Sequence, residues 1–143
     1  MTGNLGIENG KDGKKPPILV VDDNKVNQKV MCALLDRLGL PSELANDGQE
    51  AIDMVSRNKY SIILMDCHMP VMDGFEATKA IRKLESAAGT YTPIIAVTAM
   101  AMAGDRERCI AAGMDDYMSK PVDKELLKIK LNHWLREDVV YSS

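Results

Sequence analysis

The sequence predicts a doubly wound α/β domain, in which helices cover both faces of a five-stranded parallel sheet. Three short apolar runs lack polar interruption, which is typical of strands buried on both faces. Between the strand candidates, apolar residues recur at helical spacing, so that strands and helices alternate five times. Because crossovers between parallel strands are right-handed, this alternation favours a sheet with helices on both sides.

The five predicted strands differ in how strongly the sequence marks them. The apolar runs are ILVV at 18–21, SIILM at 61–65 and IIAVT at 94–98. SELA at 42–45 and DDYMS at 115–119 are shorter and more polar, and they complete the alternation. The connections between all these elements then have ordinary lengths.

The first predicted helix shows most clearly how helices are marked in this chain. Asn24 is suited to cap its start, and Gly39 is suited to end it. Its apolar stripe is formed by Val26, Val30, Leu34 and Leu38, and Met31 and Leu35 widen it. The remaining helices are expected at about 48–58, 74–84, 104–112 and 123–136, with a polar loop, SAAGTYT, before Pro93.

Length and composition fit one globular domain. The chain has 143 residues, of which 45% are hydrophobic and 27% charged. Residues 1–16 are rich in Gly, Pro and Lys and are interpreted as a flexible lead-in or linker. The domain itself is expected at 17–137, followed by a flexible tail at 138–143.

Charge and cysteine content narrow the class of protein. A net charge of −3 provides no basic field for nucleic acid. The three cysteines show no metal-binding spacing, and their odd number favours a reducing cytosol over a disulfide framework. No run approaches the roughly 20 apolar residues of a membrane span. We therefore expect a soluble, cytoplasmic domain that contacts neither nucleic acid nor membrane.

Polar side chains gather where the predicted strands end. Asp22 and Asp23 follow the first strand, Asp66 follows the third, Thr98 ends the fourth and Lys120 follows the fifth. Ligands of open α/β sheets bind at the carboxyl ends of the strands. Three carboxylates, a hydroxyl and an ammonium group are therefore expected together at one edge of the sheet.

These groups suit a metal-assisted phosphoryl site. Three carboxylates repel one another unless a cation lies between them, and Mg²⁺ prefers such oxygen ligands. The ammonium and the hydroxyl supply the positive charge and the hydrogen-bond donor that a phosphoryl group needs. No Ser–His pair or activated cysteine is expected at this edge, which favours a carboxylate as nucleophile. Each residue alone also fits an ordinary role in a cap, strand or turn, so the prediction depends on their coincidence.

Four motifs occur in the order and spacing of a known family: VVDDN at 20–24, MDCHMPVMDG at 65–74, AVTA at 96–99 and SKP at 119–121. With them the chain resembles the receiver domain of two-component response regulators, over about residues 17–137. The resemblance implies a flavodoxin-like sheet with the strand order 2-1-3-4-5.

The resemblance also implies roles at the acidic edge. Asp66 would be the phosphoacceptor, which takes a phosphoryl group from a phosphohistidine on a partner. Asp23, Asp66 and the backbone carbonyl of His68 would ligate Mg²⁺ (or Mn²⁺), whereas Asp22 would act mainly through water. Lys120 would contact the phosphoryl oxygens.

By the same resemblance, other residues would change conformation on phosphorylation or tune the rate of dephosphorylation. Thr98 would hydrogen-bond the phosphoryl group, and Tyr117 would follow it from an exposed to a buried rotamer. The side chains of His68 and Met100 occupy positions that tune how readily water attacks the acyl phosphate. Met100 offers no group to orient that water, so we expect slow to moderate dephosphorylation.

Two stretches most resemble the receivers of hybrid sensor histidine kinases: the start of the domain, with the N-x-x-N pattern of Asn24 and Asn27, and DCHMPVMDGFEAT at 66–78. A free-standing regulator that acts by protein contact is the alternative. The expected partners are a kinase dimerisation domain and a histidine phosphotransfer protein, docked over the first helix, where Val26 and Val30 add an apolar patch. The domain would promote its own Mg²⁺-dependent phosphorylation and dephosphorylation. Within a hybrid kinase, whose full chain is a kinase, it would lie in the cytoplasmic part.

Three other classes remain as alternatives. A decayed pseudo-receiver is disfavoured because every expected site residue is present. A phosphatase of the haloacid-dehalogenase type needs a second Asp two residues after the nucleophile, where this chain has His68. A purely structural binding module would not need all the acids, the threonine and the lysine together.

Overall fold

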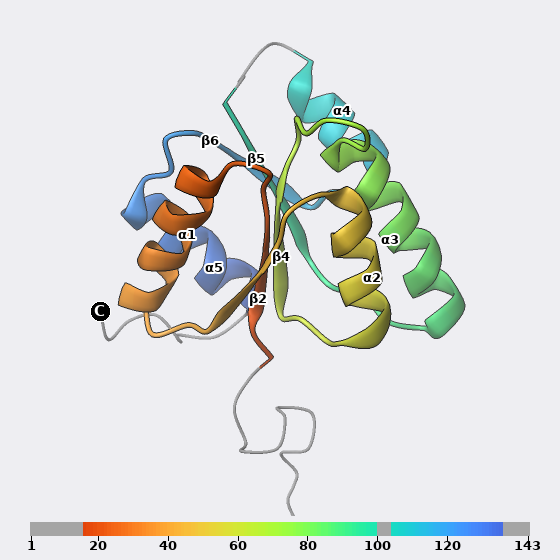
Figure 1. The fold of residues 1–143 in the computed structure, drawn as a ribbon, viewed down its shortest axis with the longest axis horizontal. Helices are drawn as coiled ribbons and strands as arrows, with labels where there is room; N and C mark the ends of the chain where they lie inside the picture. Colours follow the sequence, from red (N-terminus) through yellow and green to blue (C-terminus); the bar gives the residue numbers. More distant parts are fainter. Residues whose placement is uncertain (1–15, 100–103, 136–143) are drawn as a thin grey trace, which may run out of the picture.

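The computed structural model describes residues 16–99 and 104–135, and within them strands and helices alternate as predicted (Figure 1). The elements are β2 (Ile18–Val21), α1 (Lys25–Arg37), β3 (Ser42–Ala45), α2 (Gly48–Arg57), β4 (Ile62–Asp66), α3 (Gly74–Ala88), β5 (Ile94–Thr98), α4 (Asp105–Ala112), β6 (Asp116–Ser119) and α5 (Lys124–Leu135). The described strands form one parallel sheet in the order β3-β2-β4-β5-β6, which is 2-1-3-4-5 when these strands are counted along the chain. The predicted fold is confirmed. The predicted lead-in apart from Pro16, the predicted tail and Met100 lie outside the described residues.

Helices cover both faces of the sheet, with α1 and α5 on one side and α2, α3 and α4 on the other (Figure 1). Successive side chains of β2 enter two different cores. Ile18 and Val20 pack towards α1 and α5, whereas Leu19 and Val21 pack towards the opposite helices. Burial on both faces explains why the central strands are uninterrupted apolar runs. Within the described ranges, no helix has the length and apolar character needed to cross a membrane.

The helix ends agree with the sequence signals except at α3. The Asn24 side chain caps α1 by accepting a hydrogen bond from the Asn27 amide at 3.0 Å. Helix α3, expected to end near residue 84, continues to Ala88, so part of the predicted SAAGTYT loop is helical. Gly89 then ends the helix in the left-handed conformation, at φ 74°.

The extra turn of α3 has a physical cause in Glu85. Although charged, Glu85 is buried, and its carboxylate accepts hydrogen bonds from Arg82 Nη1 at 2.5 Å and from the Thr92 amide at 2.8 Å. Its backbone carbonyl accepts from the Gly89 amide at 2.8 Å. Because Glu85 is held at both its side chain and its backbone, the helix continues past it to the glycine.

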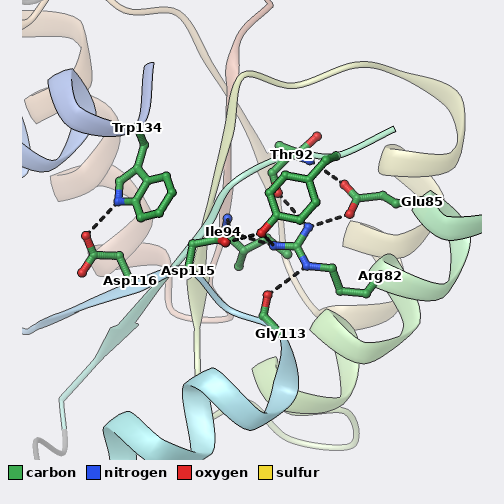
Figure 2. Close-up of polar contacts among 9 residues, drawn as sticks. Arg82, Glu85, Thr92, Ile94, Gly113, Asp115, Asp116 and Trp134 are labelled. Atoms are coloured by element: carbon green, nitrogen blue, oxygen red, sulfur yellow. Dashed lines mark hydrogen bonds and ion pairs between the residues drawn. The ribbon is translucent and has the colours of Figure 1, made fainter. Parts of the chain in front are cut away.

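Arg82 also links α3 to the starts of β5 and β6, at the edge of the sheet opposite to the predicted site (Figure 2). Its guanidinium donates to Asp115 Oδ2 at 2.8 Å, and the same oxygen accepts from the Ile94 amide at 2.8 Å. These bonds position the first residues of both strands. The strands in turn bring Thr98 and Lys120 to the other edge.

Asp116 attaches α5 to β6 (Figure 2). Its carboxylate accepts hydrogen bonds from Lys130 Nζ and from Trp134 Nε1, both at 2.8 Å. Burial opposes ionisation of this carboxyl group, but the two hydrogen bonds, a third from the Tyr117 amide and the charge of Lys130 together outweigh burial and hold the pKa of Asp116 below its usual value. The bonded carboxylate therefore fixes α5 beside the strand that carries Tyr117.

Candidate functional site

The residues predicted for the site meet at the carboxyl ends of the strands. Asp22 and Asp23 follow β2, Asp66 is the last residue of β4, Thr98 is the last residue of β5, and Lys120 follows β6. One carboxylate oxygen of each aspartate lies within 4.8 Å of the others. The fold thus brings Lys120 to Asp22 across 98 positions of sequence.

Lys120 provides the cation at the centre of this group. Its Nζ lies 3.1 Å from Asp22 Oδ2 and 3.5 Å from Asp66 Oδ1. The backbone holds it in place, because the Lys120 amide donates to the Thr98 carbonyl at 2.8 Å. One ammonium group faces three carboxylates, so the site keeps an excess of negative charge.

Burial and the neighbouring charges together perturb Asp66, which is 5% exposed. Burial raises the pKa of Asp66; the Lys120 ammonium lowers it, and the Asp22 carboxylate raises it again. The net effect is a raised pKa, so ionisation of this carboxyl group is costly in the protein alone. A divalent cation between the carboxylates would remove that cost.

Asp22 is held by a contact that the sequence interpretation missed. Its side chain accepts a hydrogen bond from the Asn24 amide at 2.9 Å, and its backbone carbonyl accepts from Gln28 Nε2 at 2.7 Å. Gln28 is buried and also donates to Asn46 Oδ1 at 2.8 Å, which ties the end of β2 to the loop after β3. The available signal was a polar residue on the buried side of the first helix.

The β4–α3 loop, residues 67–73, shapes the space around Asp66. The Gly74 amide closes the loop by donating to the Cys67 carbonyl at 2.9 Å. A Cβ on Gly74 would overlap the Asp66 carbonyl oxygen, so the close approach of α3 to the end of β4 requires glycine here. The His68 amide lies 3.3 Å from Asp66 Oδ1 and donates to it.

The remaining predicted residues differ in their surroundings. The His68 side chain is exposed, so its ring points out of the acidic group while its backbone lies beside Asp66. Tyr117 lies half-buried in β6 and packs against the core under α4. Its rotation between two rotamers stays a prediction, as does the effect of Met100.

The donor set fits a hard divalent cation. The three carboxylates offer oxygen ligands, which Mg²⁺ prefers. The uncompensated negative charge and the raised pKa of Asp66 also favour a bound cation. A thiol or an imidazole nitrogen would have favoured a softer metal, but among the described residues this cluster contains neither.

Comparison with known proteins identifies the class of protein that this fold and acidic site define. The family model described as "Response regulator receiver domain" matches residues 18–132. The chain belongs to this family, which confirms the resemblance seen in the motifs and sets aside the phosphatase interpretation.

Similar curated proteins include histidine kinases. The chain is 44% identical over 137 residues to "Hybrid signal transduction histidine kinase I" of Dictyostelium discoideum, covering 92% of this chain and 8% of that protein. It is 42% identical over 111 residues to "Sensor histidine kinase RcsC" of Salmonella typhimurium, covering 78% of this chain and 11% of that protein. The chain therefore spans only a small part of these relatives.

Two solved structures extend the comparison. The receiver domain of the sensor histidine kinase PA1611 from Pseudomonas aeruginosa, with a magnesium ion in its active-site cleft, is 45% identical with a TM-score of 0.77, over 85% of this chain and 98% of that one. The Saccharomyces cerevisiae receiver domain of Ssk1, crystallised with the histidine phosphotransfer protein Ypd1, is 30% identical with a TM-score of 0.78, over 89% of this chain and 94% of that one.

Proposed function

We propose that this receiver domain accepts a phosphoryl group onto Asp66 from a phosphohistidine, as a step of a two-component phosphorelay. The observation that carries the proposal is the convergence of Asp22, Asp23 and Asp66 with Lys120 at the end of the sheet. In the transfer, a carboxylate oxygen of Asp66 forms a bond to phosphorus while the phosphorus–nitrogen bond of the donor imidazole breaks. The imidazole leaves with the electron pair of that bond and takes up a proton.

The residues around Asp66 would have different roles in this transfer. Asp23, Asp66 and the His68 carbonyl would hold Mg²⁺ (or Mn²⁺), which supplies positive charge to the phosphoryl oxygens. The Asp22 carboxylate already bonds Lys120 and the Asn24 amide, which supports a role through water rather than direct ligation. Lys120, whose Nζ lies 3.5 Å from Asp66 Oδ1, would bind a phosphoryl oxygen.

The conformational response is proposed to pass through β5 and β6. Thr98 is buried at the end of β5, beside β4, from where its hydroxyl would bind the phosphoryl group. Tyr117, on the neighbouring strand, would then turn inward. His68 and Met100 would tune hydrolysis of the acyl phosphate, so that the domain limits the lifetime of its own phosphorylated form.

The partner surface is proposed to lie along α1. Val26 and Val30 are 68% and 52% exposed on this helix. Beside Val30 a cavity of about 160 Å³ opens between α1 and the chain after β6, lined among others by Pro121 and Val122, with Lys120 in the same wall. Apolar surface next to the site suits the helices of a histidine phosphotransfer protein or of a kinase dimerisation domain. The similarity to a receiver crystallised with such a protein supports this choice.

We further propose that the domain works as the receiver of a hybrid histidine kinase in the cytoplasm. The similarity to receiver regions of hybrid kinases supports this context. The alternative is a free-standing regulator that acts by protein contact. Phosphotransfer distinguishes them, because a hybrid-kinase receiver should return its phosphoryl group to a histidine phosphotransfer protein within minutes, whereas a terminal regulator should retain it.

The direct test uses intact-mass measurement after incubation with acetyl phosphate and Mg²⁺. We expect one phosphoryl adduct on the wild-type chain and none on Asp66→Asn or in the presence of EDTA. An adduct that persists in Asp66→Asn would contradict the assignment of the phosphoacceptor. Absence of an adduct from both acetyl phosphate and a phosphorylated phosphotransfer protein would contradict the function itself.

A further inference from the structure

Helix α4 contacts the β4–α3 loop from outside the site. Phe75, next to Gly74 at the start of α3, is 6% exposed, and the Arg108 guanidinium of α4 lies over its ring, 4.2 Å from the centroid. The His68 ring meets Phe75 edge-on, with centroids 6.1 Å apart and planes at 77°. Phe75 therefore connects an arginine of α4 to the residue whose amide donates to Asp66.

A second pair of residues brings α4 and the β4–α3 loop together. Cys109, the neighbour of Arg108, belongs to the same buried core cluster as Cys67, the neighbour of Asp66. Both cysteines are buried, and burial raises the pKa of both thiols, so the pair packs as neutral thiols. Of two consecutive residues of α4, Arg108 thus contacts Phe75, just after the loop, and Cys109 packs in the same core as Cys67, at its start.

The loop between these contacts is under backbone strain. Val71 is fully exposed and has φ 69°, a conformation that β-branched residues rarely adopt. The Met72 amide donates to the Pro70 carbonyl at 2.7 Å, which closes a tight turn around Val71. A strained segment keeps a single geometry only where the surrounding structure fixes it.

We propose that Arg108, acting through Phe75, is a positioning residue that holds the β4–α3 loop in the geometry required for phosphorylation of Asp66. The inference rests on the proposed function and adds to it a residue outside the acidic group. Arg108 keeps the Phe75 ring against His68, and the His68 backbone borders the carboxylate that reacts. Preorganised neighbours of this kind set the rate of a transfer that depends on alignment.

The test compares initial rates of phosphorylation of the full chain by acetyl phosphate at saturating Mg²⁺, read by intact mass. Arg108→Ala should slow the reaction by roughly two- to fivefold, the equivalent of one exposed cation–π contact. Arg108→Lys keeps a cation for the ring and should restore most of the rate. Arg106→Ala removes the same charge from another exposed position of α4 and should leave the rate unchanged.

A double substitution tests whether Arg108 acts through the ring. Phe75→Leu should slow phosphorylation to a similar degree, and adding Arg108→Ala to it should cause no further loss, because the contact is already absent. Thermal unfolding establishes that each variant is folded. A rate for Arg108→Ala equal to or above that of Arg106→Ala, or failure of Arg108→Lys to restore it, overturns the positioning role alone. A wild-type chain that takes up no phosphoryl group from any donor overturns the proposed function and this role together.

Discussion

The Asp66→Asn substitution should make the metal-free protein harder to unfold, although it removes the proposed phosphoacceptor. Asp66 is buried, and its carboxylate shares the site with those of Asp22 and Asp23. Burial raises the pKa of Asp66, and the partial relief from Lys120 does not cancel the rise. A carboxyl group whose pKa is raised by folding destabilises the native state once it ionises, and asparagine cannot ionise.

The size of the effect follows from the distances. At an effective dielectric constant of about 20, two unit charges 4.8 Å apart repel by about 3.5 kcal/mol. Asp66 faces two such neighbours, whereas its attraction to Lys120 at 3.5 Å amounts to about 4.7 kcal/mol. Because Asp23 is exposed, screening weakens its repulsion, so the attraction to Lys120 offsets the like charges and burial remains the main cost of ionising Asp66. We therefore expect the free energy of unfolding to rise by about 1–2 kcal/mol when asparagine removes that cost.

Urea unfolding at pH 7 in EDTA measures this rise, with Asp36→Asn, an exposed position of α1, as the control for net charge. Added Mg²⁺ should stabilise the wild type more than Asp66→Asn, because the variant lacks one carboxylate ligand. The wild type loses stability as the pH rises through the raised pKa of Asp66. The difference in EDTA should therefore vanish below the unfolded pKa of about 3.9, where Asp66 is protonated in both states. An Asp66→Asn protein no more stable than Asp36→Asn in EDTA at pH 7 would refute the conclusion that ionised Asp66 destabilises the metal-free fold.

Arg82→Ala should lower the free energy of unfolding by about 3–5 kcal/mol, because it leaves the carboxylate of Glu85 buried without its cation. In the same urea series the exposed neighbour Lys83→Ala should change it by less than about 0.5 kcal/mol, and equal losses would contradict this role. Gly74→Ala should cost about 1–3 kcal/mol in thermal unfolding and slow phosphorylation, since the added methyl displaces the end of β4; a variant with wild-type stability would contradict the close approach. Val30→Ser should slow transfer from a phosphorylated histidine phosphotransfer protein by about tenfold, through lost apolar burial, and leave acetyl phosphate reactivity unchanged. Equal slowing in both assays would argue against docking on α1.

The parts of the structure that the sequence predicts are those with local causes. Uninterrupted apolar runs mark strands covered on both faces, and the direction of a parallel sheet then brings Asp22, Asp66 and Lys120 to one edge. The sequence predicts the end of α3 too early because the cause of the longer helix is not local. The buried Glu85 carboxylate accepts a hydrogen bond from the Thr92 amide, in the connection to β5. The role of Gln28 was missed for the same reason, since its partner Asn46 belongs to another loop.

The acidic side chains at the two ends of the strands differ in how far their charge is compensated, and this difference bears on function. At one edge, Glu85 and Asp115 share the Arg82 guanidinium and accept further hydrogen bonds from backbone amides, so the carboxylates are paired within the chain. At the other edge, three carboxylates face the single ammonium group of Lys120, which leaves a net charge of −2 in a largely buried place. Folding alone does not neutralise that charge, whereas a divalent cation does, and the cation in turn attracts phosphoryl oxygens. In the proposed function, the imbalance at the second edge would therefore make the same residues dependent on metal and able to hold a phosphoryl group.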